Sequence, residues 1–193
     1  YSSSNPVVFK SDANSPTVTS SLVSSYSSNS ESASPTSEKE TISSAVVLGG
    51  ETKKYAKFII TATDTSGISS MTLKLTGKDK SDSTKDLLIE LSTETASDSS
   101  VTWTSSSAGA ATWTTRFIDM SVFASDSVSV KIVPTDGSGL TGDSSPMFYV
   151  DNDGPKITVS SPNSNSEQIG NVTISGTADP VGQSPTSTIQ FLV

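Results

Sequence analysis

Cysteine and histidine are both absent from the 193-residue chain. Without cysteine there is no disulfide, no thiol nucleophile and no thiolate ligand for zinc. Without histidine the chain lacks the commonest general base and the imidazole metal ligand. These absences exclude disulfide-stapled folds, Cys/His zinc sites and histidine-based catalytic triads. Packing, with help from a hard cation bound through oxygen, is left as the means of stabilising the fold.

Positive charge is also scarce. Twelve lysines and arginines stand against 20 aspartates and glutamates, the net charge is −8, and no basic run occurs. Because nucleic acids bind through clusters of Lys and Arg, this balance excludes them as partners. No stretch approaches the roughly 20 apolar residues that span a bilayer, so we expect no membrane contact from this segment. The chain begins at Tyr1 and stops inside an apolar run, and we interpret it as a piece of a longer protein.

Apolar residues make up only 32% of the chain, whereas serine alone supplies 43 residues. A thin sandwich of short strands with Ser/Thr-covered outer faces tolerates such a composition better than a helical protein does. The apolar residues recur with a period of two, and no segment has a helical period. We therefore predict an all-β fold, with strands at residues 16–22, 42–48, 55–63, 71–76, 87–91, 101–104, 112–120, 128–135, 147–150, 157–159, 172–174 and 189–193.

Residues 147–159 divide the chain into two parts. Alternating apolar runs flank the acidic segment Asp151-Asn152-Asp153 and a Gly-Pro pair, so one strand ends and another begins within a few residues. Residues 9–19 are a partial copy of this segment, which favours a tandem array. The predicted organisation is a tail and linker at 1–15, a sandwich at 16–150 with an exposed Ser-rich insertion at about 23–41, a linker at 151–155, and the first strands of a truncated second domain at 156–193.

An Asp-x-x-Gly turn follows three of the predicted strands, beginning at Asp64, Asp136 and Asp179. One reading is turn chemistry alone, in which Asp accepts hydrogen bonds from nearby backbone N–H groups and Gly supplies a positive φ. The other reading is a set of metal ligands. An EF-hand is excluded, because the acidic segment lacks the spacing and the bidentate Glu of that loop.

The direction of the strands groups these aspartates at two joints. In a sandwich alternate loops share one end, which places Asp12 and Asn14 beside Asp64 and Asp136 at the first joint. The same argument places Asp151, Asn152 and Asp153 beside Asp179 at the second. Converging carboxylates repel one another unless a cation lies among them, and Ca²⁺ takes six to eight oxygen ligands. We predict Ca²⁺ more strongly for the second joint than for the first, with solvated linker charges as the alternative.

The two tryptophans have different settings. Trp113 belongs to an alternating strand and is expected to pack between the two sheets. Trp103 lies among Ser and Thr residues, where it either packs at an edge or presents its ring to a sugar.

Several segments resemble bacterial Ig-like domains. Residues 58–68 are similar to their B strand and B–C turn, residues 112–120 and 128–139 to their E and F strands, and residues 149–155 to their interdomain linker. The resemblance implies an Ig-like β-sandwich with Greek-key topology, in tandem with its neighbours, and linker aspartates hold Ca²⁺ in some such arrays. The predicted domain has 135 residues against about 100 for a typical Ig-like domain, and the excess lies mostly in the Ser-rich insertion.

We expect no enzyme and no catalytic residue, because no base stands beside a candidate nucleophile and a carboxylate pair in a linker has no cleft to desolvate it. The resemblance implies a stalk segment of a multidomain adhesin or other protein on the outside of a bacterial cell, with neighbouring Ig-like domains as partners. Two alternatives stay open. One is a module that binds a glycan or a host protein through the insertion or Trp103. The other is a fibre subunit that assembles through an exposed strand edge.

Overall fold

A computed structural model describes residues 12–93, 102–104, 109–154, 156–162 and 167–179. Within these residues the protein is almost entirely β-structure, with a single 3₁₀ turn, η1 (Met120–Val122), as its helical element. The all-β prediction is thus confirmed. None of the described helical structure is long and apolar enough to cross a membrane. The predicted strand at residues 189–193 and most of the predicted tail at 1–15 lie outside the described residues.

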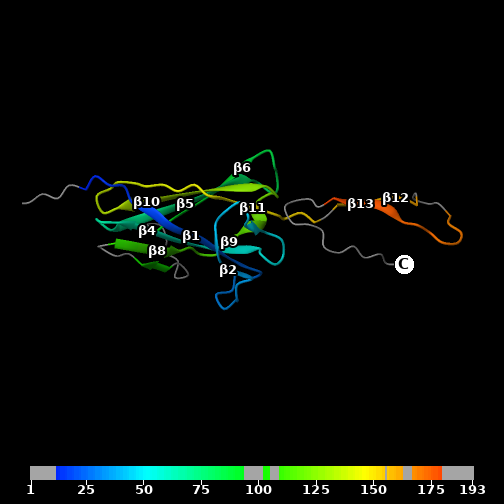
Figure 1. The fold of residues 1–193 in the computed structure, drawn as a ribbon, viewed down its shortest axis with the longest axis horizontal. Coiled ribbons are helices and arrows are strands. Elements are labelled where there is room, and N and C mark those ends of the chain that lie inside the picture. The colour runs from blue at the N-terminus through cyan, green and yellow to red at the C-terminus, as the bar shows by residue number, and fades with distance from the viewer. Residues whose placement is uncertain (1–11, 94–101, 105–108, 155, 163–166, 180–193) are drawn as a thin grey trace, which may run out of the picture.

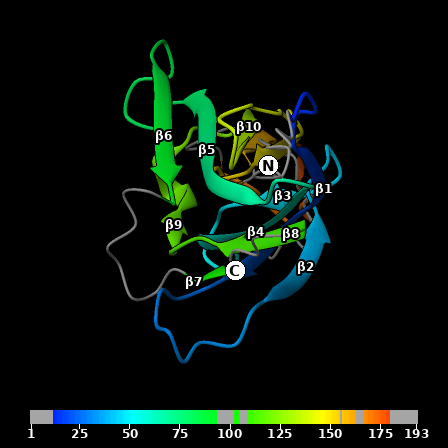
Figure 2. The ribbon, with the colours of Figure 1, turned by 90° about the vertical axis from the view of Figure 1, so that its left-hand side faces the viewer.

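Two sheets pack face to face as a β-sandwich, seen end-on in Figure 2. The six-stranded sheet has the order β2-β1-β4-β8-β7, with β9 also paired to β4. Its strands are β1 (Thr17–Tyr26), β2 (Ser37–Thr41), β4 (Tyr55–Asp64), β7 (Thr102–Thr104), β8 (Gly109–Thr114) and β9 (Ile118–Asp119). The five-stranded sheet has the order β3-β11-β10-β5-β6. Its strands are β3 (Val47–Leu48), β5 (Ile68–Lys78), β6 (Asp86–Ser92), β10 (Ser127–Asp136) and β11 (Met147–Val150).

The period-two pattern of the sequence builds the core between the sheets. In β4 the side chains of Phe58, Ile60 and Ala62 are buried, while the residues between them are partly exposed on the outer face. Phe58 meets Phe148 of the opposite sheet with ring centroids 5.9 Å apart. Trp113 is also buried, as predicted. Aromatic and aliphatic side chains from both sheets thus form one continuous core.

The Ser-rich insertion is shorter than predicted. Strand β1 continues to Tyr26, and Val23, Ser24 and Ser25 within it are buried. Strand β2 pairs antiparallel with β1 through Leu22↔Thr41. The loop between these strands therefore covers only residues 27–36. The apolar pattern does not predict the end of β1 or strand β2, because serines and charged residues occupy these positions. Pairing with neighbouring strands, rather than burial of apolar side chains, stabilises them.

Two other strand predictions need correction. The strand expected at 42–48 is reduced to β3, which pairs in parallel with β11 through Tyr149↔Val47. The strand expected at 112–120 is divided into β8, which starts earlier, at Gly109, and stops at Thr114, and the short β9 at Ile118–Asp119. Thr115 is buried there, and its Oγ1 accepts a hydrogen bond from the backbone N–H of Phe58 at 3.0 Å and donates one to the carbonyl oxygen of Arg116 at 2.9 Å. The N–H of Thr115 also donates to the carbonyl oxygen of Phe58 at 2.9 Å, so the side-chain bridge replaces only one of the two backbone bonds of a regular ladder pair.

A separate two-stranded sheet follows the sandwich. Strand β12 (Lys156–Ser161) pairs antiparallel with β13 (Ser175–Asp179), and Figure 1 shows this hairpin beyond one end of the sandwich. The strand predicted at 172–174 does not form, and β13 begins one residue later. Ile157 and Val159 of β12 are more than half exposed, because no second sheet covers them among the described residues.

Candidate metal centre

Three segments meet at the end of the sandwich where the chain enters it. Strand β4 ends at Asp64 and strand β10 ends at Asp136. Asp12 lies a few residues before β1, whose first residue, Thr17, pairs with Thr63 next to Asp64. Strand direction therefore delivers all three aspartates to the same end, as the sequence predicts.

Two glycines allow the loops at this end to approach closely. A Cβ on Gly137 would lie 2.7 Å from the carbonyl oxygen of Ser66, and a Cβ on Gly142 would collide with the carbonyl oxygen of Pro16. The N–H of Gly137 also donates to the carbonyl oxygen of Gly67 at 3.1 Å. Only glycine lets the β10–β11 loop touch both the β4–β5 loop and the incoming chain.

The three carboxylates form a compact cluster. One oxygen from each of Asp12, Asp64 and Asp136 lies within 4.8 Å of the other two. Each carboxylate also accepts local hydrogen bonds. Asp64 Oδ1 accepts from the N–H and hydroxyl of Ser66 at 2.7 and 2.8 Å, and Asp12 Oδ1 accepts from the N–H of Asn14 at 3.0 Å. These aspartates can therefore accept the hydrogen bonds of their own turns and still form a cluster.

Asp136 is the central member of the cluster. Its side chain is only 1% exposed. Its Oδ1 accepts hydrogen bonds from the N–H groups of Ser138 and Leu140, both at 2.8 Å. Its Oδ2 is buried and has no hydrogen-bond partner, and the same holds for Oδ2 of Asp12. A buried carboxylate oxygen without a partner is energetically unfavourable, so the arrangement calls for a compensating positive group.

No ion pair between described residues supplies that group, since none of the salt bridges among them involves these three aspartates. Two unit charges about 4 Å apart repel by about 4 kcal/mol at an effective dielectric constant of 20. The N–H of Asn14, together with the Ser66 hydroxyl, lowers the pKa of Asp12 and so favours its charged form. The donors are all hard oxygens, which suit Ca²⁺.

At the opposite end of the sandwich, the outlet, Asn152 has a structural role. Its Nδ2 donates to the carbonyl oxygens of Met120 and Phe123 at 2.8 and 2.7 Å, and its Oδ1 accepts from the N–H of Gly50 at 2.9 Å. Its own N–H donates to Ser125 Oγ at 2.8 Å. The side chain predicted as a metal ligand is therefore used to fasten the outgoing chain to the sandwich.

Asp153 at the outlet pairs with a lysine that the sequence analysis did not single out. Lys80 Nζ forms an ion pair with Asp153 Oδ1 and also donates to the carbonyl oxygen of Asn152 at 3.3 Å. The hydrogen bond from Lys80, and then that from Ser125, lowers the pKa of Asp153. Lys80 belongs to a charged turn distant in sequence, so only the fold reveals its proximity.

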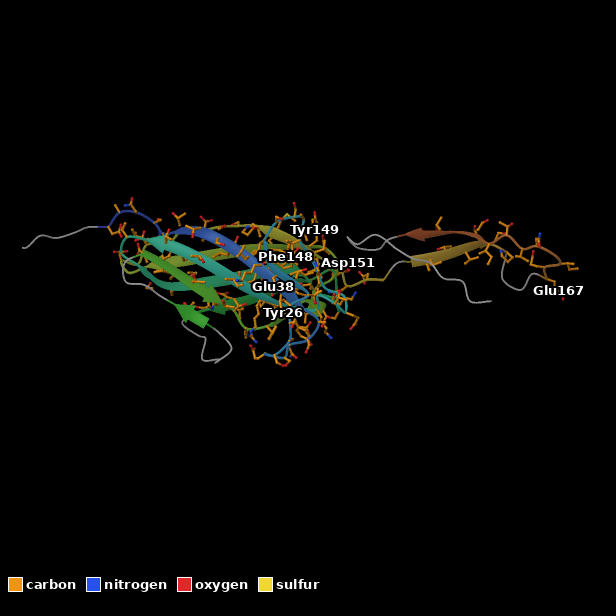
Figure 3. The ribbon with its side chains drawn as sticks, turned by 60° about the horizontal axis from the view of Figure 1, so that its bottom comes forward. Tyr26, Glu38, Phe148, Tyr149, Asp151 and Glu167 are labelled. Atoms are coloured by element: carbon orange, nitrogen blue, oxygen red, sulfur yellow. The ribbon has the colours of Figure 1, made fainter. Side chains whose placement is uncertain are left out.

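The other two predicted ligands of the second joint are placed only in part. Asp151 is half-buried, and its N–H donates to the carbonyl oxygen of Leu48 at 2.8 Å. Figure 3 shows it where the chain leaves the sandwich toward the hairpin. Asp179 ends β13 and pairs through its backbone with Lys156, but its side chain is outside the described part. The metal predicted at the second joint stays a prediction.

Comparison of the chain with protein-family models, with curated proteins and with solved structures gives no match.

Proposed function

We propose that this chain is a non-enzymatic spacer segment in a tandem array of Ig-like domains on the outside of a bacterial cell, and that Ca²⁺ at the inlet fixes the incoming chain to the sandwich. The observation that carries the proposal is the buried, unpartnered Oδ2 of Asp136 beside the carboxylates of Asp64 and Asp12. Asp12 belongs to the incoming segment, whereas the other two belong to the sandwich. A shared cation would therefore connect linker and domain.

The strand order supports the Ig-like part of the proposal. The sequence β1-β4-β8-β7 in one sheet corresponds to the A-B-E-D order of Ig-like domains. In the other sheet β11-β10-β5 corresponds to G-F-C, with β6 in the place of the additional C′ strand. The parallel pairing of β3 with β11 extends the second sheet.

The placement of the chain ends supports a role as a spacer. The chain enters the sandwich before β1 at one end of its long axis and leaves it after β11 at the other, so domains joined in this way would extend in line (Figure 1). The hairpin also repeats the start of the sandwich. Ile157 pairs with Ala178 much as Val18 pairs with Ala62. This pairing supports a second domain of the same kind.

The donor set favours Ca²⁺ over Mg²⁺. Mg²⁺ usually keeps several waters and is bound through one or two carboxylates, whereas Ca²⁺ takes six to eight oxygen ligands in a flexible geometry, and three carboxylate oxygens within 4.8 Å of one another fit that larger ligand set. One Ca²⁺ would neutralise two of the three carboxylate charges. Backbone carbonyls or water would supply the remaining ligands.

Calorimetric titration of the whole chain with Ca²⁺ tests the proposal. We expect saturable binding with Kd between about 10⁻⁶ and 10⁻³ M and a rise in Tm on loading. Asp136→Asn should abolish both effects. Asp143→Asn is the matched control, since Asp143 is exposed in the same loop. Absence of binding to the unaltered chain, or equal binding by Asp136→Asn, would overturn the proposal.

A further inference from the structure

A hollow of about 380 Å³ lies near the outlet end of the sandwich, away from the acidic cluster of Asp12, Asp64 and Asp136. Residues from both sheets and from the loop at 27–36 line it. Its lining includes Asn29, Tyr55, Ile89, Arg116, Phe117 and Val122. Its volume falls within the roughly 300–1,000 Å³ range typical of small-ligand sites. We refer to it as the Arg116 groove.

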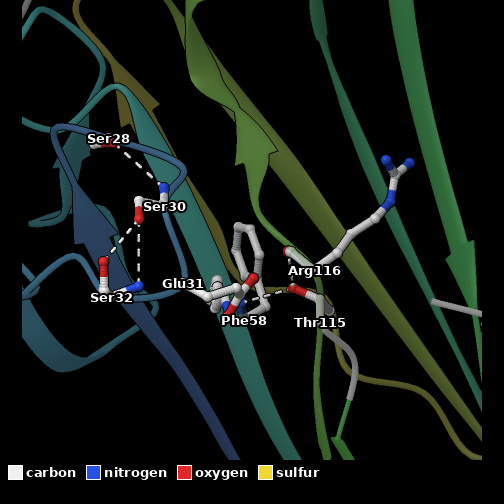
Figure 4. Close-up of polar contacts among 8 residues, drawn as sticks. Ser28, Ser30, Glu31, Ser32, Phe58, Thr115 and Arg116 are labelled. Atoms are coloured by element: carbon white, nitrogen blue, oxygen red, sulfur yellow. Dashed lines mark hydrogen bonds and ion pairs between the residues drawn. The ribbon is translucent and has the colours of Figure 1, made fainter. Parts of the chain in front are cut away.

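Arg116 is the single arginine of the chain. Its side chain is exposed and forms no ion pair with any described residue, although six lysines do. Figure 4 shows the guanidinium pointing away from Glu31 and Thr115. A guanidinium presents a rigid fork of donors that binds a carboxylate through two parallel hydrogen bonds. An acidic chain thus places an uncommitted carboxylate-binding group at the edge of this groove.

The rest of the lining is apolar and aromatic. Val122 is 38% exposed, and Ile89, Tyr55 and Phe117 are half-buried. Asn29 adds an amide that both donates and accepts hydrogen bonds. Asp119 also lines the groove, but its Oδ1 already accepts from the N–H and hydroxyl of Ser121 at 2.9 and 2.6 Å. The lining therefore combines apolar faces, one amide, a carboxylate that bonds within its own turn and a guanidinium that has no ion pair among the described residues.

Asn29 brings the Ser-rich loop into one wall of the groove, and contacts of its neighbours hold that loop in place. Glu31 forms an ion pair with Lys57 at 2.8 Å, and Lys57 Nζ lies 4.2 Å from the centre of the Phe117 ring. Tyr26 meets the same ring edge-on, with centroids 4.9 Å apart. Within the loop Ser30 bonds to both Ser28 and Ser32, as the dashed lines in Figure 4 show. The wall is therefore fixed before a ligand arrives, which lowers the entropy cost of binding.

We propose that the Arg116 groove binds a saccharide that carries a carboxylate, such as a uronic or sialic acid residue. The guanidinium would bind the carboxylate, the apolar lining would face the C–H surface of the sugar ring, and Asn29 would bond a hydroxyl. An acidic peptide fits less well, because acidic motifs are recognised by clusters of arginines, whereas Arg116 is the single arginine of the chain. Here the lining comes from separate segments of both sheets. The inference goes beyond the spacer role and does not depend on the cation.

Titration of the ¹⁵N-labelled whole chain with N-acetylneuraminic acid and with glucuronic acid, followed by NMR, tests this inference. EDTA is present throughout, so that carboxylate binding through Ca²⁺ cannot contribute. We expect saturable shifts at millimolar ligand, centred on Arg116, Phe117 and Asn29. Glucose, which lacks the carboxylate, should cause shifts at least tenfold weaker.

The variants isolate the role of the guanidinium. Arg116→Gln should weaken binding at least tenfold with Tm unchanged, and Arg116→Lys should restore part of it. Lys131→Gln removes an exposed charge from β10 and serves as the control. The inference fails if neither acid gives saturable shifts, if Arg116→Gln binds as well as the unaltered chain, or if a triglutamate peptide binds more tightly than both sugars.

Discussion

Asn152 Oδ1 accepts a hydrogen bond from the N–H of Gly50 at 2.9 Å, joining residues 102 positions apart in the sequence. A Cβ on the preceding Gly49 would lie only 2.6 Å from the same oxygen, and the φ of Gly49 is +98°. Glycine is therefore required for this approach on both steric and conformational grounds. The contact holds the end of β11 and the following linker against the β3–β4 loop.

Replacement of Asn152 by alanine should destabilise the sandwich. The variant loses three side-chain hydrogen bonds and leaves the carbonyls of Met120 and Phe123 without these donors. At about 1 kcal/mol for each bond, the free energy of unfolding should fall by about 2–4 kcal/mol. Urea unfolding measures this change, with the exposed Asn171→Ala as control. A loss below about 0.5 kcal/mol would show that water replaces these contacts without cost.

Replacement of Gly142 by alanine should act on both stability and the cation site. The added methyl collides with the carbonyl oxygen of Pro16, so the β10–β11 loop must move away from the incoming chain. We expect a loss of about 1–3 kcal/mol in the free energy of unfolding and weaker Ca²⁺ binding. Gly154→Ala is the matched control, because nothing lies within 4 Å of its Cβ position. Unchanged Ca²⁺ affinity in Gly142→Ala would show that Ca²⁺ binding does not need the contact between the β10–β11 loop and the incoming chain.

The ion pair at the outlet should make stability depend on pH. Lys80 lowers the pKa of Asp153 below the ordinary value of 3.8, so the folded state binds fewer protons than the unfolded chain. The contribution is complete above the unfolded pKa and disappears as the pH falls through the folded pKa. Because both side chains are partly exposed, it should reach at most about 1 kcal/mol.

Urea midpoints measured between pH 6 and pH 2.5 check this expectation. Asp153→Asn and Lys80→Gln should each lower stability at pH 6, and the deficit should shrink toward pH 2.5. The double variant should be no less stable than either single variant, since the pair is already broken. A deficit that stays constant across the whole pH range would contradict the assignment.

Much of the fold could be predicted from local patterns. The period-two alternation in residues 55–63 and 128–135 locates the central strands β4 and β10, because a half-buried strand must alternate. The parity of these strands also predicts that Asp12, Asp64 and Asp136 lie at one end, and the structure places their carboxylates within 4.8 Å. Pattern and topology together were sufficient for this cluster.

Strands stabilised by their neighbours were not predictable in the same way. Strand β2 has the sequence Ser-Glu-Lys-Glu-Thr, which has no apolar face, and it forms because β1 offers a free edge. Strand β3 is only two residues long and exists through its parallel pairing with β11. Strand β2 therefore carries no local hydrophobic signal, and β3 is too short for its two apolar residues to show a period.

The sequence by itself determined the β class, the positions of the long strands and the exclusion of thiol and imidazole chemistry, because these follow from residue types and their local period. The tertiary structure alone decided that Asn152 and Lys80 hold the outlet and that Arg116 stands beside a groove that Asn29 of the Ser-rich loop helps to line. Such contacts join residues far apart in the chain. Their energy depends on distance and burial, which no local pattern records.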